Sequence, residues 1–192
     1  MCDPHKTALL LVDIQNDYWL PPREPREAFV HAAQELLDLA RESGMLVVHV
    51  QHARREGTGK GGFEQDTPGF DVHESVYPLA DEIRIVKHEP SSFFETDLDL
   101  ILRNAGVDSV VVCGMQTQKC CDTTTRSAKA RGYECYFVSD AVETFDLRGP
   151  DGLVVDRDEI ARVTFATMQN GFAKVLRVDE LKQLVAPLST VA

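Results

Sequence analysis

The sequence predicts a single-domain α/β protein, a three-layer α/β/α sandwich with a six-stranded, mostly parallel, doubly wound sheet over residues 1–192. Two observations predict this fold. Short β-type runs alternate with helical patterns, which is typical of parallel strands joined by crossover helices. Most runs are rich in Val, Ile and Leu without strict alternation, as strands buried on both faces are. With 43% apolar residues, the chain of 192 residues can also bury a core by itself.

Six segments have the composition of strands. They are residues 7–14, 45–51, 83–87, 108–114, 134–140 and 172–178. In sheets of this class, ligand sites form at the carboxyl ends of the strands, and the familiar strand order is 3-2-1-4-5-6. In that order the second strand separates the third from the first.

Three helical patterns lie between these strands. Each ends before a glycine, Gly44, Gly106 or Gly132, which is a common signal of a helix C-terminus. The apolar positions that define the first two are Phe29, Ala33, Leu36, Leu37 and Ala40, and then Leu98, Ile101, Leu102 and Ala105. The glycine-containing segments 52–80 and 143–157 do not fit the alternation, and such insertions usually serve as flexible lids or subunit contacts.

The charge balance argues against two classes of partner. The chain has 20 basic and 31 acidic residues, a formal net charge of -11, which repels a nucleic-acid backbone and an anionic membrane alike. The first apolar run is short and is interrupted by Asp13, so it offers neither a signal-peptide core nor a membrane span of about 20 residues. We therefore expect a cytoplasmic protein whose partner is a small-molecule substrate.

The five cysteines favour a reduced protein. Their number is odd, and their positions show neither a disulfide framework nor a CxxC pair for zinc. Cys113 and Cys135 lie inside strand patterns, where a cysteine is usually a small hydrophobic residue. Cys120 falls in or beside the first turn of the third helix, where backbone N–H groups favour a thiolate. A redox pair of Cys120 and Cys121 is less favoured, because a disulfide between neighbours is strained.

Reactive side chains follow three of the predicted strands. Asp13 ends the first strand, Lys87 ends the third, and Cys120 follows the fourth. A carboxylate at the edge of an apolar layer must be paired, hydrogen-bonded or protonated. Position alone leaves simpler interpretations open, since Asp13 could cap the following loop at Asn16 and Lys87 could extend its amine to water.

Three stretches together resemble the isochorismatase-like cysteine hydrolases, the superfamily of nicotinamidases, N-carbamoylsarcosine amidohydrolases and isochorismatases. They are LLLVDIQNDY, IVKHEPSSFFETDLDLILRNAGVDSVVVCG and GMQTQKCCDTTTRSAKARGYECYFVSDA. The resemblance implies a catalytic triad of Asp13, Lys87 and Cys120. It also implies a cis peptide between Met115 and Gln116, with the amides of Gln116 and Cys120 as oxyanion donors. Lys87 and the helix terminus should then raise the thiolate fraction of Cys120, while the nearby negative charge of Asp13 opposes them.

Aromatic residues beside the triad positions are candidates for substrate binding. The candidates are Tyr18, Trp19, Phe93 and Phe94, together with Gln51 near the end of the second strand. Packing in the core or between subunits is the alternative for the four aromatic residues. Family members usually assemble, so the resemblance also implies a homo-oligomer.

The resemblance also bears on metal binding. Nicotinamidases carry an Asp-x-His metal motif after the second strand, and His52 and Arg54 stand at its two positions here. We therefore expect no metal and no other cofactor. His49 and His52 are three residues apart on a strand, which points them to opposite faces and argues against a shared metal.

The resemblance implies a hydrolase that cleaves a C–N bond of a small amide, carbamoyl or ureido compound through a thioester on Cys120. Family members that cleave the vinyl ether of isochorismate generally lack the cysteine, so its presence favours C–N hydrolysis. Vinyl ether cleavage remains the alternative reaction. A non-catalytic binding or assembly module of the same fold is the other alternative.

Overall fold

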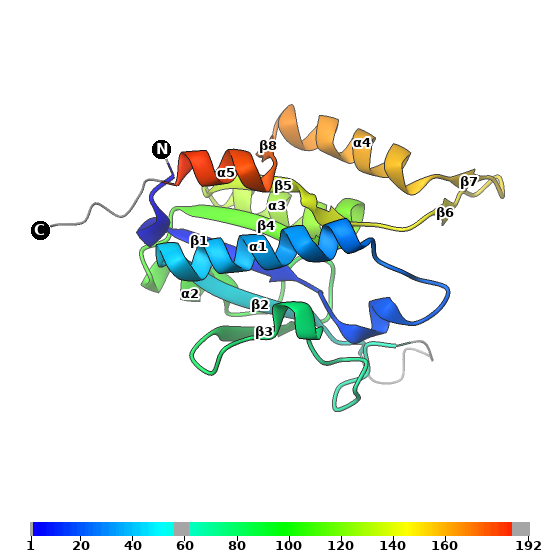
Figure 1. The fold of residues 1–192 in the computed structure, drawn as a ribbon, viewed down its shortest axis with the longest axis horizontal. Helices are drawn as coiled ribbons and strands as arrows, with labels where there is room; N and C mark the ends of the chain where they lie inside the picture. The colour runs from blue at the N-terminus through cyan, green and yellow to red at the C-terminus, as the bar shows by residue number, and fades with distance from the viewer. Residues whose placement is uncertain (1, 56–61, 186–192) are drawn as a thin grey trace, which may run out of the picture.

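The computed structural model describes residues 2–55 and 62–185. Six strands form one parallel sheet in the order β3-β2-β1-β4-β5-β8 (Figure 1). They are β1 (Thr7–Val12), β2 (Leu46–His52), β3 (Ile83–Lys87), β4 (Ser109–Met115), β5 (Glu134–Glu143) and β8 (Lys174–Leu176). The predicted doubly wound sheet is confirmed, and each strand lies within or overlaps a segment that the sequence singled out.

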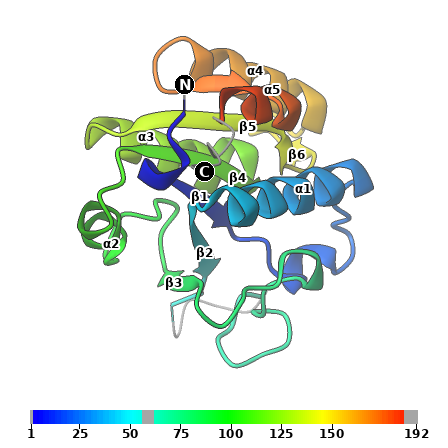
Figure 2. The same ribbon diagram turned by 60° about the vertical axis from the view of Figure 1, so that its left-hand side comes forward.

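Helices cover both faces of this sheet (Figure 2). One face packs against α1 (Glu27–Ser43) and α5 (Val178–Leu184). The other face packs against α2 (Leu98–Asn104), α3 (Asp122–Ala130) and α4 (Arg157–Gln169). Short helical turns complete the structure: η1 (Pro4–Lys6), η2 (Asn16–Trp19), η3 (Glu74–Val76) and the π-helical turn η4 (Thr117–Cys121).

The central strand β1 shows why its sequence lacks polar positions. Leu9 and Leu11 face the α1 side, whereas Ala8, Leu10 and Val12 face the α2 and α3 side. All six residues of β1 are buried, so both faces of the strand must be apolar. Asp13 is the first residue after the strand, and the apolar run ends there.

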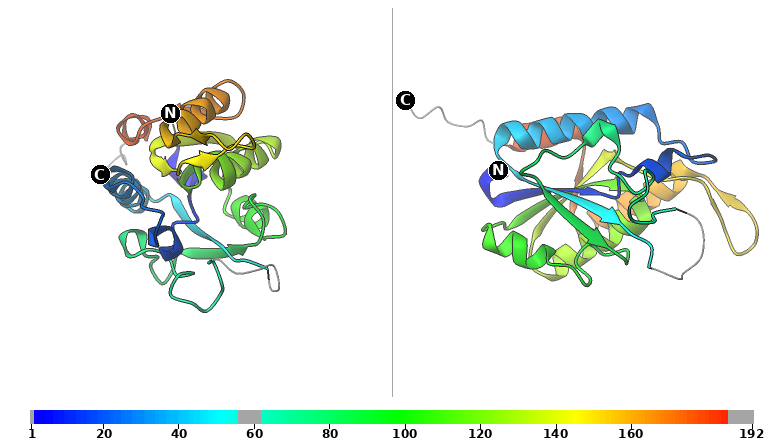
Figure 3. Two further views of the ribbon diagram at one scale, coloured as in Figure 1. Left: turned by 90° about the vertical axis from the view of Figure 1, so that its right-hand side faces the viewer. Right: turned by 90° about the horizontal axis from the view of Figure 1, so that it is seen from below.

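Segment 143–157 contains a feature that the sequence did not predict. Strands β6 (Leu147–Arg148) and β7 (Val154–Val155) pair as an antiparallel hairpin. Figure 3 shows this hairpin extending beyond the sheet, next to the start of α4. None of the helices in the described ranges is both long and apolar enough to cross a membrane.

Candidate active site

Asp13 and Lys87 form a buried ion pair at the carboxyl edge of the sheet. Lys87 Nζ lies 2.8 Å from Asp13 Oδ2, and both side chains are 0% exposed. The same ammonium donates to the backbone oxygen of Glu89 at 3.2 Å. Cys120 interacts with both charged groups, so the structure brings all three candidate catalytic residues together.

The topology places Lys87 on a strand that is not the neighbour of β1. Strand β2 lies between β1 and β3, and Lys87 is aligned with His52 at the end of β2. The lysine side chain therefore spans the width of β2 to reach Asp13. Burial by itself lowers the pKa of Lys87, but the charges of Asp13 and Cys120 outweigh it and the pKa is raised.

The backbone of Asp13 turns sharply where β1 ends. Its φ is 54°, in the left-handed region that Asp tolerates better than most residues. Its N–H donates to Val50 O at 2.8 Å, which holds the turn against β2. Asp13 Oδ2 receives Lys87, whereas Oδ1 is buried and has no hydrogen-bond partner among the described residues. That oxygen is available to accept a proton.

Gly114 lets the turn that leads to Cys120 approach the end of β1, next to Asp13. Its φ is +119°, and a Cβ at this position would lie 2.0 Å from Val12 O. Only glycine fits so close to the end of β1. The peptide between Met115 and Gln116 is cis, and η4 follows with Cys120 as its fourth residue.

Cys120 differs from the other cysteines in its exposure. It is partly exposed, whereas Cys2, Cys113, Cys121 and Cys135 are buried. Burial and then the charge of Asp13 raise the pKa of Cys120 to about 12, although Lys87 opposes them. The sequence-based expectation of an increased thiolate fraction is therefore wrong. The resting thiol is protonated, and it needs a base to become a nucleophile.

Tyr18 lies close to Asp13 and Cys120. It is 6% exposed, and its pKa is raised by burial and by the negative charges of Asp13 and Cys120. Its ring lies 5.0 Å from the ring of Phe63 and 5.9 Å from that of Phe145. These two rings come from the segments 52–80 and 143–157, so both insertions contribute to the surroundings of the site. No periodic pattern could have identified Phe63 or Phe145.

The other binding candidates have structural contacts of their own. Trp19 stacks on His73 with ring centroids 3.7 Å apart, and Gln51 Nε2 donates to Phe70 O at 2.9 Å. Phe93 packs against Tyr133, with ring centroids 6.0 Å apart at the far end of α3, and Phe94 is 51% exposed. These contacts are made with residues other than Asp13, Lys87 and Cys120.

Gln15 is a residue that the sequence analysis missed. It is fully buried, and its Nε2 donates to His52 O at 3.1 Å and to Phe70 O at 2.8 Å. Its Oε1 accepts from His52 N at 2.8 Å. Gln15 thus joins the segment after Asp13 to the end of β2 and to the loop at Phe70. The available signal was the position of this glutamine, two residues after Asp13 in the stretch LLLVDIQNDY.

The two positions of the nicotinamidase metal motif do not supply a pair of ligands for a divalent cation, because only one of them holds a side chain that can bind a metal. His52 Nδ1 is buried without a partner among the described residues, and the pKa of His52 is lowered by burial and by Lys87. Arg54 Nε donates to Gly62 O at 3.2 Å, and a guanidinium is not a metal ligand. His49 instead lies 2.9 Å from Glu82. Within residues 2–55 and 62–185, no group of three or more His, Cys, Asp or Glu could hold a metal.

Known proteins resemble this chain over most of its length. The family model described as Isochorismatase domain matches residues 7–180. The uncharacterized isochorismatase family protein YddQ of Bacillus subtilis (strain 168) is 42% identical over 178 residues, which cover 91% of this chain and 97% of YddQ. Maleamate amidohydrolase of Pseudomonas putida is 30% identical over 180 residues, which cover 80% of this chain and 84% of that enzyme.

A solved structure shares the fold closely. The cysteine hydrolase from Pseudomonas syringae pv. phaseolicola 1448A superposes with a TM-score of 0.88 at 28% identity, and the match covers 95% of this chain and 93% of that one. Sequence and fold therefore agree over nearly the whole length of the chain. The protein belongs to the isochorismatase family of hydrolases.

Proposed function

We propose that the protein hydrolyses a C–N bond of a small amide, carbamoyl or ureido compound through a thioester on Cys120. The observation that carries this proposal is the grouping of a protonated, partly exposed thiol with a buried carboxylate that has a free oxygen. Such a pair can generate a thiolate at the moment of reaction. The name of maleamate amidohydrolase, one of the relatives, describes an enzyme that acts on an amide.

In the first half of the reaction, the Cys120 proton passes to Asp13 and the sulfur attacks the carbonyl carbon. The N–H groups of Gln116 and Cys120, in the turn that holds the sulfur, stabilise the negative oxygen. The C–N bond then breaks, and Asp13 returns its proton to the departing nitrogen. Lys87 remains protonated throughout and stabilises the anionic partner of each step.

In the second half, Asp13 takes a proton from water and the hydroxyl attacks the thioester carbonyl. The C–S bond breaks, the acid is released, and the proton on Asp13 returns to the Cys120 sulfur. The sum is one amide and one water converted to one acid and one amine or ammonia. Tyr18 is placed to bound the substrate pocket, because it is close to both Asp13 and Cys120.

A screen for released ammonia tests the proposal directly. Small primary amides, carbamoyl amino acids and ureides are incubated with the protein, and ammonia is measured with a coupled dehydrogenase. Isochorismate is included, with pyruvate as the measured product. The proposal predicts ammonia from at least one C–N substrate, with Cys120→Ser inactive. Release of pyruvate without ammonia from any other compound would support vinyl ether cleavage instead.

A further inference from the structure

The turn η4 that carries Cys120, together with its N-cap residue Gln116, makes few side-chain hydrogen bonds within the described residues. Gln116 Oε1, Thr117 Oγ1 and Gln118 Nε2 are all buried and have no hydrogen-bond partner among the described residues. The remaining oxygen, Gln118 Oε1, accepts a hydrogen bond from Thr144 Oγ1 at 2.7 Å. Within the described part of the chain, this is the one side-chain hydrogen bond made by these three residues.

Thr144 is itself held firmly at the end of β5. It is 0% exposed, and its N–H donates to Glu143 Oε1 at 2.9 Å. Glu143 is also fully buried, and Arg26 binds both of its oxygens, with Nε at 2.8 Å from Oε2 and Nη2 at 2.9 Å from Oε1. The backbone N–H of Arg26 donates to Oε2 as well, at 3.0 Å. A bidentate pair with two further backbone donors fixes the carboxylate in one geometry.

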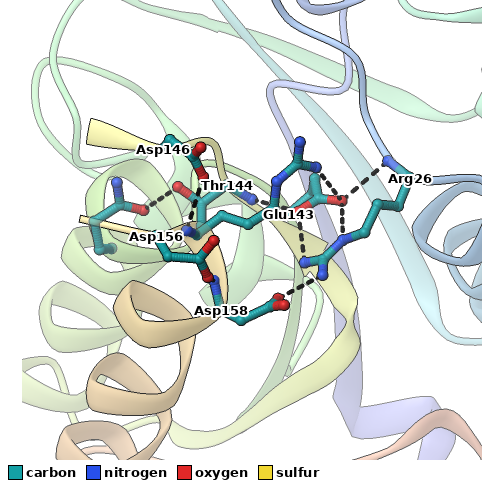
Figure 4. Close-up of polar contacts among 8 residues, drawn as sticks. Arg26, Glu143, Thr144, Asp146, Asp156 and Asp158 are labelled. Carbon is teal, nitrogen blue, oxygen red and sulfur yellow. Dashed lines mark hydrogen bonds and ion pairs between the residues drawn. The ribbon is translucent and has the colours of Figure 1, made fainter. Parts of the chain in front are cut away.

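This network connects elements that are distant in the sequence. Arg26 stands at the start of α1, and its Nη1 reaches Asp158 Oδ1, in the first turn of α4, at 2.5 Å. Figure 4 shows Arg26 between Glu143 and Asp158, with Thr144 on the opposite side of Glu143 from Arg26. The hydroxyl of Thr144 is therefore attached to a rigid junction of α1, β5 and α4, and it reaches from there to the nucleophile's turn.

We propose that Thr144 is a positioning residue for the reaction: its backbone N–H is held by the Arg26–Glu143 pair, and its hydroxyl fixes Gln118 and thereby the turn that presents Cys120 to Asp13 and Lys87. Gln118 lies two residues before Cys120 in η4. Without the hydroxyl, the buried amide of Gln118 loses its one described hydrogen bond, and a buried amide without partners moves to find new ones. The thiol then moves relative to its charged neighbours. This inference rests on the proposed role of Cys120 as the nucleophile.

The test is the pH dependence of Cys120 alkylation, which reports the surroundings of the sulfur without needing the natural substrate. The groups that act on Cys120 are Asp13 and Lys87, and Cys120 acts in turn on Tyr18. Iodoacetamide is reacted with the 192-residue chain from pH 6 to 11, and the rate at Cys120 is followed by peptide mass spectrometry. Because burial and Asp13 raise the pKa of the thiol, a displaced thiol titrates at lower pH.

Three variants give the comparison. Thr144→Val keeps the shape of the side chain but removes the hydroxyl, and the pH profile of Cys120 alkylation is expected to move to lower pH. Each pH unit of that shift corresponds to a tenfold increase in the thiolate fraction at a fixed pH. Thr144→Ser restores the donor and should return the profile to that of the wild type. Thr7→Val is the matched control, because Thr7 is a buried threonine at the opposite end of β1 from Asp13, and its hydroxyl donates to Asp3 O at 2.6 Å. Its profile should match the wild type.

Gln118→Met removes the acceptor instead of the donor, so it tests the same hydrogen bond if Thr144→Val folds poorly, and the two substitutions together form a double-mutant cycle. If Thr144 acts through Gln118, the shift in the double variant equals that of either single variant rather than their sum. A Thr144→Val profile that superimposes on the wild type, or additive shifts, would overturn the inference. Failure of the proposed function is a separate result, because turnover would then survive Cys120→Ser whatever Thr144 does.

Discussion

Lys87 Nζ and Asp13 Oδ2 lie 2.8 Å apart with both side chains fully buried, although their strands are separated by β2. A buried charge without a partner destabilises the folded state far more than a buried pair does, so the burial of each residue depends on the charge of the other. The pair also leaves Asp13 Oδ1 without a partner among the described residues, on the carboxylate that interacts with the Cys120 thiol. One ion pair thus links the stability of the sheet edge to the proposed chemistry.

Lys87→Met should destabilise the protein by about 3–5 kcal/mol, because it leaves Asp13 buried and unpaired. Urea unfolding measures the loss, and Lys174→Met, an exposed lysine of β8, is the control with an effect within about 0.5 kcal/mol. The double variant Lys87→Met/Asp13→Leu should recover most of the loss. A change of less than about 1 kcal/mol in Lys87→Met would contradict the burial of the pair.

The same pair predicts a pH dependence of stability. The folded-state pKa of Lys87 is raised above the ordinary value of 10.5, so the folded protein holds this proton more tightly than the unfolded chain. Its stabilisation is fully present below about pH 10 and is lost as the pH rises through the raised pKa. The difference in free energy of unfolding between the wild type and Lys87→Met should therefore become smaller only at strongly alkaline pH.

Asp13→Asn should abolish turnover and yet speed up alkylation of Cys120. The carboxylate raises the pKa of the thiol, so its removal lowers that pKa. At pH 8 the thiolate fraction then increases about tenfold for each unit by which the pKa falls. Iodoacetamide labelling at pH 8 measures the rate. Asp122→Asn is the control, since Asp122 lies close to Cys120 in sequence but pairs with Arg126. Slower labelling in Asp13→Asn would mean that the carboxylate does not face the thiol.

Much of the fold could be predicted from the sequence, and the reasons are visible in β1. Strands buried on both faces form continuous apolar runs, and Gly44 ends α1 with a φ of 78° in the left-handed region. Helix α4 was missed because Val163, an apolar residue, is 54% exposed while Thr164 is buried, which blurs the helical period. Residues such as Phe145 and Glu143 act through contacts with distant segments, which no local pattern records.

The protonation of Cys120 could not be predicted for the same reason. Its position near a helix start favoured a thiolate, but α3 begins only at Asp122. The pKa of the thiol is instead raised mainly by burial and by the charge of Asp13, which lies more than 100 residues earlier in the sequence. The sequence identified which residues to examine. The balance of their charges depends on distances that only the folded chain sets.

Turnover should be independent of metal. Dialysis against EDTA followed by o-phenanthroline is expected to leave the rate on any substrate from the ammonia screen unchanged, because His52 and Arg54 offer no ligand pair for a divalent cation. Addition of zinc, manganese or iron should not increase the rate. A loss of activity that one of these metals restores would contradict the assignment and favour a nicotinamidase-like centre.

We propose that the chain forms a homo-oligomer in which the β6–β7 hairpin is a contact. Leu153, Val154 and Val155 are consecutive apolar residues that are 68%, 58% and 36% exposed, and a contiguous apolar patch of this kind suits a subunit contact. Light scattering at micromolar concentration should give a mass above the 21.4 kDa of one chain, and Val154→Asp should lower it. Leu100→Asp, at an equally exposed leucine of α2, is the control that should leave the mass unchanged. A wild-type mass of one chain would contradict the proposal.

The most direct measurement is the mass of the covalent intermediate. A substrate that passes the ammonia screen is mixed with the Cys121→Ser variant, the reaction is quenched in acid within milliseconds, and the peptide containing Cys120 is analysed by tandem mass spectrometry. The account predicts an acyl group on Cys120 that hydroxylamine removes, nearly full turnover in Cys121→Ser, and neither adduct nor turnover in Cys120→Ser. An adduct on Cys121 in the wild type, or turnover that survives Cys120→Ser, would contradict it.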